Sequence, residues 1–212
     1  DKINLLFMGD NSAKTMALQS GQVDLVENIT NVADIQDFQD SDDFTVDIAS
    51  GVRCGFAWMN FDGVLGNKTL RQAILMAIDY DTICNSRTIG GLYTPGFSVL
   101  PSTLDYDFNN NNWITVGTGD PLAYMANWAT DTSYCAYSNP DYDKLYEELK
   151  GEMDPEKRKD LIFQMQQILV DDAAVLIDGY YNSSMIYSKK VGSAHIHTAD
   201  YYWLSTEITP AE

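Results

Sequence analysis

The sequence predicts an α/β fold in which a mixed β-sheet is flanked by helices. Apolar runs at residues 3–8 and 173–177 are typical of strands that are covered on both faces. The order strand, helix, strand over residues 3–26 indicates a crossover unit, which occurs in parallel and mixed sheets. With 212 residues, of which 45% are hydrophobic and 21% are charged, the chain is long enough to bury a substantial core.

The crossover unit comes first in the chain. The strand at residues 3–8 is followed by residues 10–12, whose sequence Asp-Asn-Ser offers side-chain oxygens that cap a helix. Gly21 is suited to the position just after the end of this helix, where a left-handed backbone is common. Residues 23–26 then form a short second strand or the approach to one.

Residues 31–50 are acidic and interrupted, which suits a short solvent-facing helix followed by a strand at 44–48. Residues 54–61 predict a separate, aromatic strand. The clearest helix of the first half starts near Thr69, which forms a capping box with Gln72. Its apolar stripe, which we expect in the core, consists of Leu70, Ala73, Ile74, Ala77 and Ile78.

The middle of the chain is irregular. Residues 88–106 contain several glycines and prolines and predict a long connection, and loops of that length are often functional. Residues 109–112 are four consecutive asparagines, a residue poor in both helix and strand, so we interpret them as a tight connection or a splice between two structural pieces. Residues 113–116 predict a short strand, and a turn of helix follows through Tyr124 and Met125.

The second half is mainly helical. Residues 139–140, Asn-Pro, start a helix that ends at Gly151, and residues 154–155, Asp-Pro, start the longest helix. Residues 173–177 form an interior strand, and the sequence from Tyr180 onward is strand-like and aromatic. The buried stripe of the longest helix consists of Leu161, Ile162, Met165, Ile168 and Leu169.

Charge excludes two classes of partner. The chain has 13 Lys and Arg against 31 Asp and Glu, a net charge of -18, and this field repels phosphate backbones and anionic lipid headgroups. We therefore expect no nucleic-acid partner and no membrane-surface binding. No apolar run approaches the roughly 18 residues that a membrane-spanning helix needs.

Catalytic and metal-binding signals are weak. There is no nucleophile elbow, Walker loop or dinucleotide-binding motif, so we predict no catalytic residues and no cofactor. Cys54, Cys84 and Cys135 are far apart and allow at most one intrachain disulfide. His195 and His197 would share one face of a strand and could hold a metal, but no acidic or thiol partner is identifiable, so we favour surface or packing histidines and predict no metal site.

Aromatic residues are the more informative feature. The chain has 13 tyrosines and 4 tryptophans, and several tyrosines fall where loops are expected. A tyrosine combines apolar area with a hydroxyl, which suits a wet cleft that holds a small polar ligand. For any single tyrosine a place at the edge of the core is the more common case, but as a group they favour binding over catalysis. The residues concerned are Tyr93, Tyr134, Tyr137, Tyr180 and Tyr181.

Taken in order, several segments resemble the extracytoplasmic solute-binding proteins of the dipeptide, oligopeptide and nickel class, which serve ATP-binding-cassette (ABC) importers. The elements R-Q-A-I-x-x-A-I-D and Q-x-I-L-x-D-D are specific when they occur together. The resemblance implies one lobe of a type II periplasmic-binding-protein fold. The matching segments are DKINLLFMGDNSAKTMALQSGQVDLVE, the strand that ends with WMNF, LRQAILMAIDYDTI, the loop at 95–101, GDPLAYM, SNPDYDKLYEEL, DPEKRKDLIFQMQQILVDDAAVLI and the Tyr180–Tyr181 strand.

The chain departs from this family in length. Members are more than twice as long and carry an N-terminal lobe ahead of the segment that begins here, so residues 1–212 resemble a single C-terminal ligand-binding lobe. Members also carry a further helix, strand, helix, strand stretch where this chain has only residues 107–112. We expect residues 188–212 to pack on the absent N-terminal lobe of the same parent chain.

The resemblance also implies a site. In peptide-binding relatives an acidic residue four positions before the proline of the D-P pair binds the amino group of the peptide. Gly117 occupies that position here, so Asp120 is the candidate substitute. The ligand-binding residues implied in this way are Trp58, Trp113, Thr115, Thr118, Asp120, Tyr134, Tyr137 and Tyr180.

The function implied is that of the substrate-binding component of an ABC importer. Two lobes would close by hinge motion around a peptide or a nickel chelate and deliver it to the permease. The location would be extracytoplasmic, either periplasmic or at the cell surface, with any lipid anchor in the absent N-terminal region. Two alternatives remain: a signalling or regulatory module that kept the lobe without transport, and a hydrolase that uses a pair of aspartates.

Overall fold

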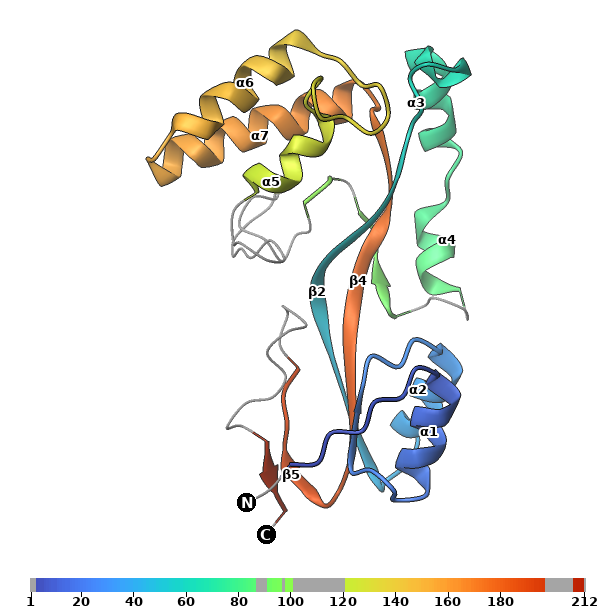
Figure 1. Ribbon diagram of the computed structural model, residues 1–212. Helices are drawn as coiled ribbons and strands as arrows, with labels where there is room; N and C mark the ends of the chain where they lie inside the picture. Colours follow the sequence, from blue (N-terminus) through green and yellow to red (C-terminus); the bar gives the residue numbers. More distant parts are fainter. Residues whose placement is uncertain (1–2, 87–90, 97, 101–120, 197–207, 212) are drawn as a thin grey trace. The chain divides into compact units, whose positions relative to one another are not determined.

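The computed structural model describes residues 3–86, 91–96, 98–100, 121–196 and 208–211 (Figure 1). Its main sheet has the strand order β1-β4-β2, and β3 pairs with β4. β1 and β4 are antiparallel, with Val26 opposite Ile186. A second, two-stranded sheet pairs β5 with β6 in antiparallel fashion. The strands are β1 (Leu25–Glu27), β2 (Phe44–Trp58), β3 (Tyr93–Thr94), β4 (Val175–Ser188), β5 (Val191–Ser193) and β6 (Thr209–Pro210).

The chain divides into two compact units. The terminal unit comprises Asp1–Gly51, Ile83–Tyr93 and Asn182–Glu212, and the central unit comprises Val52–Thr82 and Thr94–Tyr181. The long strands β2 and β4 each contribute residues to both units. The prediction of a single lobe over residues 1–212 stays a prediction.

The terminal unit contains α1 (Asn11–Gln19) and α2 (Val32–Gln39). The side chain of Asp10 caps α1 by accepting a hydrogen bond from the Ala13 N–H at 3.2 Å, as the Asp-Asn-Ser sequence predicts. Gly21 has a φ of 72°, in the left-handed region that favours glycine after a helix. Buried side chains of both helices join those of the sheet in one core: Leu18, Val26, Ile29, Val32, Ile35, Phe38, Leu92 and Ile186.

Two predictions for the strands of the first half are wrong. Residues 3–8 are not a strand, and Phe7 is 97% exposed. An apolar run becomes a strand only when another strand accepts its hydrogen bonds, and β1 pairs with β4 instead. The strands predicted separately at 44–48 and 54–61 are one strand, β2, which continues through Gly51.

The central unit contains α5 (Leu122–Met125), α6 (Pro140–Gly151) and α7 (Pro155–Asp171), with the 3-10 turn η2 (Ala126–Trp128) between α5 and α6. Asn139 and Asp154 cap α6 and α7 with their side chains, and a proline follows each cap, as predicted. The predicted α7 stripe is buried, apart from Ile168, which is half-buried. The predicted interior strand is the start of β4, where Val175 and Ile177 are buried.

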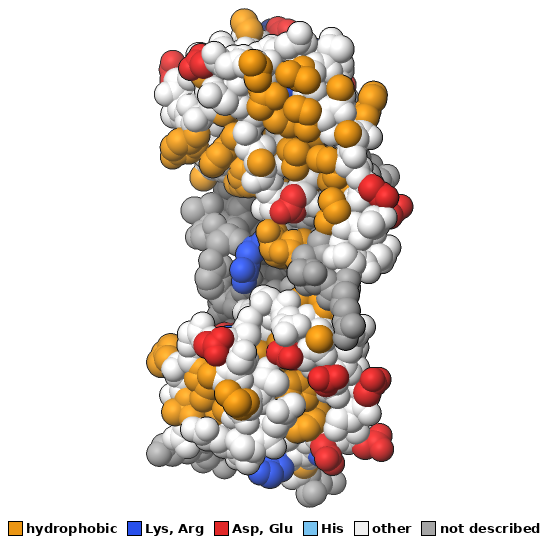
Figure 2. Space-filling model, turned by 90° about the vertical axis from the view of Figure 1, so that its right-hand side faces the viewer, with side chains coloured by type: hydrophobic (Ala, Val, Ile, Leu, Met, Phe, Trp, Pro, Cys, Tyr) orange, Lys and Arg blue, Asp and Glu red, His pale blue; other side chains and the backbone are white. Residues whose placement is uncertain are grey.

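The helix α3 (Lys68–Met76) differs from the prediction in two ways. It is capped by Asn67, whose Oδ1 accepts from the Leu70 N–H at 3.2 Å, and not by Thr69. Its one buried residue is Arg71, whereas Leu70, Ala73 and Ala77 of the predicted core stripe are exposed. Figure 2 shows hydrophobic side chains gathered on the side of the central unit where α3 lies. The remaining helical elements are η1 (Val64–Gly66) and α4 (Tyr80–Asn85).

Several predicted features lie outside the described residues, among them the strand at 113–116, the asparagine run at 109–112 and His197. None of the three cysteines is in a disulfide. None of the described helices combines the length and the apolarity that crossing a bilayer requires.

Candidate functional site

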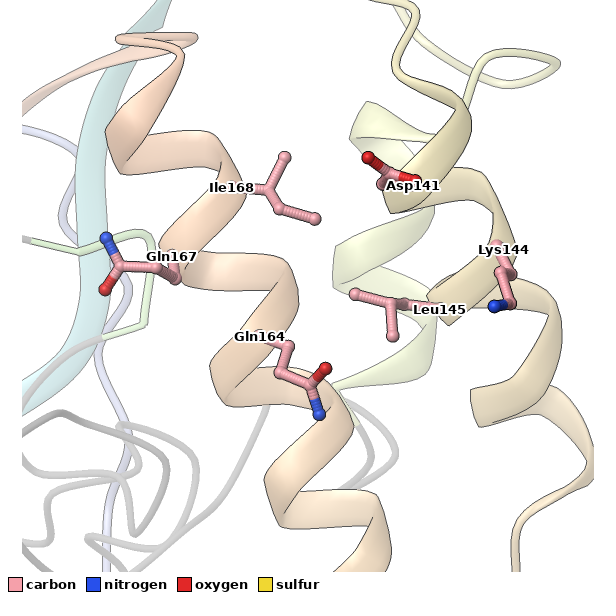
Figure 3. A pocket seen from close by; sticks show the side chains of 6 residues that line it. All are labelled: Asp141, Lys144, Leu145, Gln164, Gln167 and Ile168. Carbon is pink, nitrogen blue, oxygen red and sulfur yellow. The ribbon is translucent and has the colours of Figure 1, made fainter.

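A groove of about 370 Å³ lies between α6 and α7 (Figure 3). Leu145 and Ile168 form its apolar floor, and both also pack against the main core of the central unit. Its rim is polar and mixed in charge, with Asp141 and Lys144 from α6 and two glutamines from α7. The groove is open, and none of the predicted binding residues lines it.

A second surface feature consists of two predicted binding residues, Trp58 and Tyr134. Their ring centroids are 5.4 Å apart with an interplanar angle of 43°. Trp58 is 42% exposed at the end of β2, and Tyr134 is 76% exposed in the connection between η2 and α6. Two aromatic faces that are both open to solvent can contact an apolar or planar ligand group, so we define this pair as the candidate site.

Further aromatic rings support the pair from beneath. Phe56 is 5.1 Å from Trp58 in an edge-to-face arrangement and 5.8 Å from Trp128, which is fully buried. Tyr124 is 5.4 Å from Trp128 and 5.9 Å from Phe56. Edge-to-face packing restrains each ring, so Trp58 is held in place before a ligand arrives.

The backbone on either side of Tyr134 is also fixed. The Ser133 hydroxyl accepts a hydrogen bond from the Tyr137 N–H at 3.1 Å, and the Phe61 N–H donates to the Cys135 carbonyl at 3.0 Å. Ala136 has a φ of 57°, so the chain turns sharply here. These contacts hold the connection against the residues that follow β2 and place the Tyr134 ring beside Trp58.

Arg71 links several segments of the central unit through hydrogen bonds in its interior. Its guanidinium donates to the carbonyls of Leu65 at 2.7 Å, Asp172 at 2.6 Å and Ala173 at 3.0 Å, and it lies 4.3 Å from the Phe61 ring centroid. Arg71 belongs to the R-Q-A-I element and Asp172 to the Q-x-I-L-x-D-D element, so the two sequence signatures meet at this contact. Their role here is structural.

The Asp172 side chain is the second part of this network. It accepts hydrogen bonds from the Tyr137 hydroxyl and the Asn139 amide, each at 2.8 Å, and from Lys68 at 3.2 Å. Burial raises the pKa of Asp172, but these three hydrogen bonds outweigh that effect and hold the pKa below its usual value. Burial is the main cause that raises the pKa of Tyr137, followed by its bond to Asp172, so its hydroxyl stays protonated.

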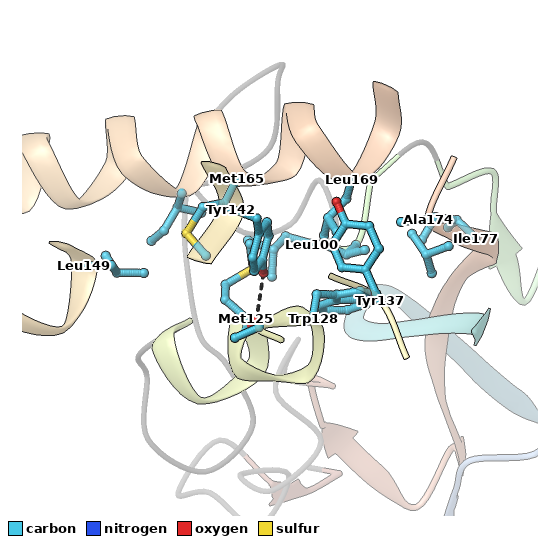
Figure 4. Packing of buried hydrophobic residues seen from close by; sticks show 14 of the residues in the cluster. Leu100, Met125, Trp128, Tyr137, Tyr142, Leu149, Met165, Leu169, Ala174 and Ile177 are labelled. Carbon is cyan, nitrogen blue, oxygen red and sulfur yellow. Dashed lines mark hydrogen bonds between the residues drawn. The ribbon is translucent and has the colours of Figure 1, made fainter. Parts of the chain in front are cut away.

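Tyr137 and Tyr180 are therefore placed differently from the exposed pair. Tyr137 is buried beside Trp128 and Tyr142, whose hydroxyl donates to the Met125 carbonyl at 2.8 Å (Figure 4). The buried Tyr180 hydroxyl donates to the Ser98 carbonyl at 3.1 Å and accepts from the Ser98 N–H at 3.2 Å. A ligand role for either residue stays a prediction. The other predicted binding residues, Trp113, Thr115, Thr118 and Asp120, lie outside the described residues.

Two polar groups beneath the candidate site have no partner within the described part of the chain. They are the Tyr124 hydroxyl and the Trp128 Nε1–H, and both atoms are buried. Burial is the main cause that raises the pKa of Tyr124. A buried donor without an acceptor lowers the stability of the fold, so removing the Tyr124 hydroxyl or the Trp128 N–H should cost little stability or increase it.

Metal ligands do not gather in the described residues, where no group of three or more His, Cys, Asp or Glu side chains is suitably placed. His195 Nδ1 is 3.8 Å from one Asp47 carboxylate oxygen, with the imidazole largely exposed. Sequence reasoning missed the supporting roles of Phe56, Trp128 and Arg71. The R-Q-A-I element was the available signal for Arg71, and the aromatic content of residues 54–61 was the signal for Phe56.

Comparison with protein families decides the class of this chain. Residues 1–164 match the family model of bacterial extracellular solute-binding proteins, family 5 Middle. The chain belongs to this family. The match agrees with the resemblance found in the sequence, and it places the chain among extracellular solute-binding proteins.

Solved structures confirm the fold of this family 5 chain. CtaP from Listeria monocytogenes, an ABC transporter substrate-binding protein, matches with a TM-score of 0.79 and 17% identity over 97% of this chain and 59% of its own. NikA from Brucella suis, in complex with Fe(III)-EDTA, matches with a TM-score of 0.80 and 12% identity over 96% of this chain and 60% of NikA. DppA from Helicobacter pylori, in complex with the peptide STSA, matches with a TM-score of 0.70 and 14% identity over 97% of this chain and 56% of DppA. The predicted α/β type II fold is thus confirmed.

This family 5 chain therefore spans about three-fifths of the length of the structures that it matches. A search of curated protein sequences found no match.

Proposed function

We propose that this chain is the substrate-binding component, or one lobe of it, of an ABC importer. It captures a peptide-type or nickel-chelate-type solute and delivers it to the permease without catalysis. Family membership supports the solute-binding role. Two structural relatives support the two solute classes, since DppA is in complex with a peptide and NikA with a metal chelate.

The observation that carries this proposal is the exposed pair Trp58 and Tyr134 on its packed aromatic support. A peptide presents apolar side chains and planar amides, and a histidine chelate presents imidazole rings. Both chemistries gain from contact with aromatic faces, and a tyrosine adds a hydroxyl for a polar group. Because Trp58 is already restrained by Phe56, little conformational entropy is lost when a ligand binds.

The remaining predicted contacts belong to the same proposal. Trp113, Thr115 and Thr118 would extend the site, with Asp120 as the group that pairs with a peptide amine in place of the glycine at 117. Tyr137 and Tyr180 would contribute indirectly, because their hydroxyls bond to Asp172 and Ser98 in the interior.

The partners proposed are the ABC permease and a second lobe of the same parent chain. The chain spans only about three-fifths of its structural relatives, which leaves room in them for a further lobe. We place the protein outside the cytoplasm, in the periplasm or at the cell surface, in keeping with a family of extracellular proteins. Attachment by a lipid belongs to this proposal as well.

Isothermal titration calorimetry tests the binding role. The 212-residue chain is titrated with a mixture of three- to five-residue peptides and, separately, with Ni(II) and L-histidine. We expect Trp58→Ala to weaken binding at least tenfold, which is typical of an aromatic anchor, about 1.4 kcal/mol. Phe7→Ala is the matched control, because Phe7 is an exposed aromatic residue of the terminal unit. Equal affinity in the Trp58 and Phe7 variants would refute the site.

A non-transport signalling or regulatory module remains the second candidate. Mass spectrometry of the native gene product distinguishes the two. Peptides from a second solute-binding lobe support the importer, whereas peptides from a fused output domain support the signalling module.

A further inference from the structure

The residues that flank the candidate site in the chain are mostly polar. The pair Trp58 and Tyr134 presents two aromatic rings to solvent. Neither flanking stretch, 57–63 or 129–136, contains Lys, Arg or His. A ligand group that is positively charged and donates hydrogen bonds therefore suits this site better than an anionic group. The exposed flanking residues that end in amide, hydroxyl or carboxylate groups are Asn60, Asp62, Thr130, Asp131 and Thr132.

The backbone holds Asp62 close to the segment that carries Tyr134. The Phe61 N–H donates to the Cys135 carbonyl at 3.0 Å, so Asp62 and Tyr134 are each one residue away from this hydrogen bond. The Asp62 N–H donates to the Asn60 side chain at 3.1 Å, which fixes the turn after β2. The Asp62 side chain is exposed and makes no ion pair with any described residue. Its negative charge is therefore available to a ligand.

Basic side chains elsewhere in the central unit already have partners. Arg71 is buried and donates to four backbone carbonyls. Lys68 pairs with Asp172 at 3.2 Å, and its charge is thereby partly neutralised. Lys150 pairs with Glu147 at 2.5 Å. The chain as a whole carries a net charge of -18, so its field attracts cations and repels anions at an exposed site.

Aromatic rings also attract cations directly. The face of a π system is negative, so a cation within about 6 Å of the centre of a Trp or Tyr ring is stabilised, most strongly by Trp. An arginine guanidinium is planar and weakly hydrated, so it stacks on such a ring more readily than a lysine ammonium does. The Trp58 ring is restrained by Phe56 at 5.1 Å, so it is in place before a ligand arrives.

We infer that the candidate site takes the guanidinium group of an arginine-containing peptide. This inference rests on the proposed function and narrows its solute class to cationic peptides. The guanidinium stacks on the Trp58 ring and contacts the Tyr134 ring, while its N–H groups face the Asp62 carboxylate. The same charges make the site unfavourable for a peptide whose side chains are acidic.

Isothermal titration calorimetry of the 212-residue chain with two matched peptides tests this inference. The peptides are Ala-Ala-Arg-Ala and the same sequence with citrulline, whose side chain keeps the length and planarity of arginine but carries no charge. We expect the arginine peptide to bind at least about fivefold more tightly, and this preference to shrink when the salt concentration rises from about 20 mM to about 300 mM. Equal affinities would refute the guanidinium site but leave the proposed function standing. Failure of every peptide and of the nickel chelate to bind would refute both.

Variants assign the preference to individual side chains. Trp58→Leu keeps apolar area but removes the aromatic face, so the ratio of the two affinities should fall below about twofold. Asp62→Asn should weaken binding of the arginine peptide about threefold and leave the citrulline peptide unchanged. Asp37→Asn is the matched control, because Asp37 is an exposed aspartate on α2 of the terminal unit. An arginine preference that survives Trp58→Leu would refute the contact with the ring, and equal effects of the two aspartate variants would refute the role of Asp62.

Discussion

Replacing Arg71 tests the internal network on which the candidate site rests. In Arg71→Ala the four carbonyl groups that accept from the guanidinium lose their donor inside the protein. One hydrogen bond to a charged group contributes about 1.5–3 kcal/mol, and part of this is recovered when water reaches the carbonyls. We therefore expect Arg71→Ala to lower the free energy of unfolding by about 3–5 kcal/mol.

Urea denaturation followed by tryptophan fluorescence measures this loss, because Trp128 is fully buried in the folded central unit. Arg71→Lys keeps the charge but not the planar fork of donors, so it should recover less than half of the lost stability. Lys68→Ala is the control, since its exposed ion pair with Asp172 contributes about 0–1 kcal/mol. A loss below about 1.5 kcal/mol for Arg71→Ala would show that the carbonyls do not depend on the guanidinium.

Three further predictions concern single side chains of the central unit. Tyr124→Phe removes a buried hydroxyl that has no partner within the described residues, so the free energy of unfolding should rise by about 1 kcal/mol in urea; a loss of that size would reveal a partner for the hydroxyl. Because the pKa of Asp172 is lowered in the folded state, its carboxylate stabilises the protein above pH 3.8 and this contribution is lost as the pH falls further. The stability difference between the wild type and Asp172→Asn should therefore shrink in acid, and a constant difference from pH 7 to pH 2 would contradict the assignment. Burial, and then the nearby Asp178, raise the pKa of Cys54 to about 12, so iodoacetamide at pH 8 should alkylate it at least about tenfold more slowly than free cysteine, as mass spectrometry would report.

Features set by neighbouring residues were predictable from the sequence. Asn139 and Asp154 cap their helices through N–H groups two or three residues away, so the Asn-Pro and Asp-Pro pairs were sufficient to place both starts. The stripe of α7 was also predictable, because a long helix with one apolar side needs to bury it.

Features that depend on distant partners were not predictable. Residues 3–8 have the composition of a strand, but strand formation requires a neighbour that the sequence does not identify. In α3 the periodicity located the apolar side correctly, yet a buried arginine with backbone acceptors about a hundred residues away decided which side faces inward. The burial of Arg71 reverses the usual rule for charged residues.

The candidate site likewise combines features that the sequence predicts with contacts that depend on distant partners. The aromatic excess and the family resemblance pointed to Trp58 and Tyr134, but their contact depends on the fold that brings the end of β2 to the connection before α6. Tyr137 belongs to the same loop as Tyr134, and the sequence offered no way to tell that one ring faces solvent while the other packs inside.

The Arg71 contacts also have a consequence for biosynthesis. The acceptor carbonyl of Asp172 is 101 positions further along the chain, so a ribosome that adds about 5–20 residues per second makes it about 5–20 s after Arg71. Until then Arg71 lacks its carbonyl acceptors at Asp172 and Ala173, and α3 cannot take its final place in the central unit. Translation that stops before residue 172 would release a product unable to close the central unit.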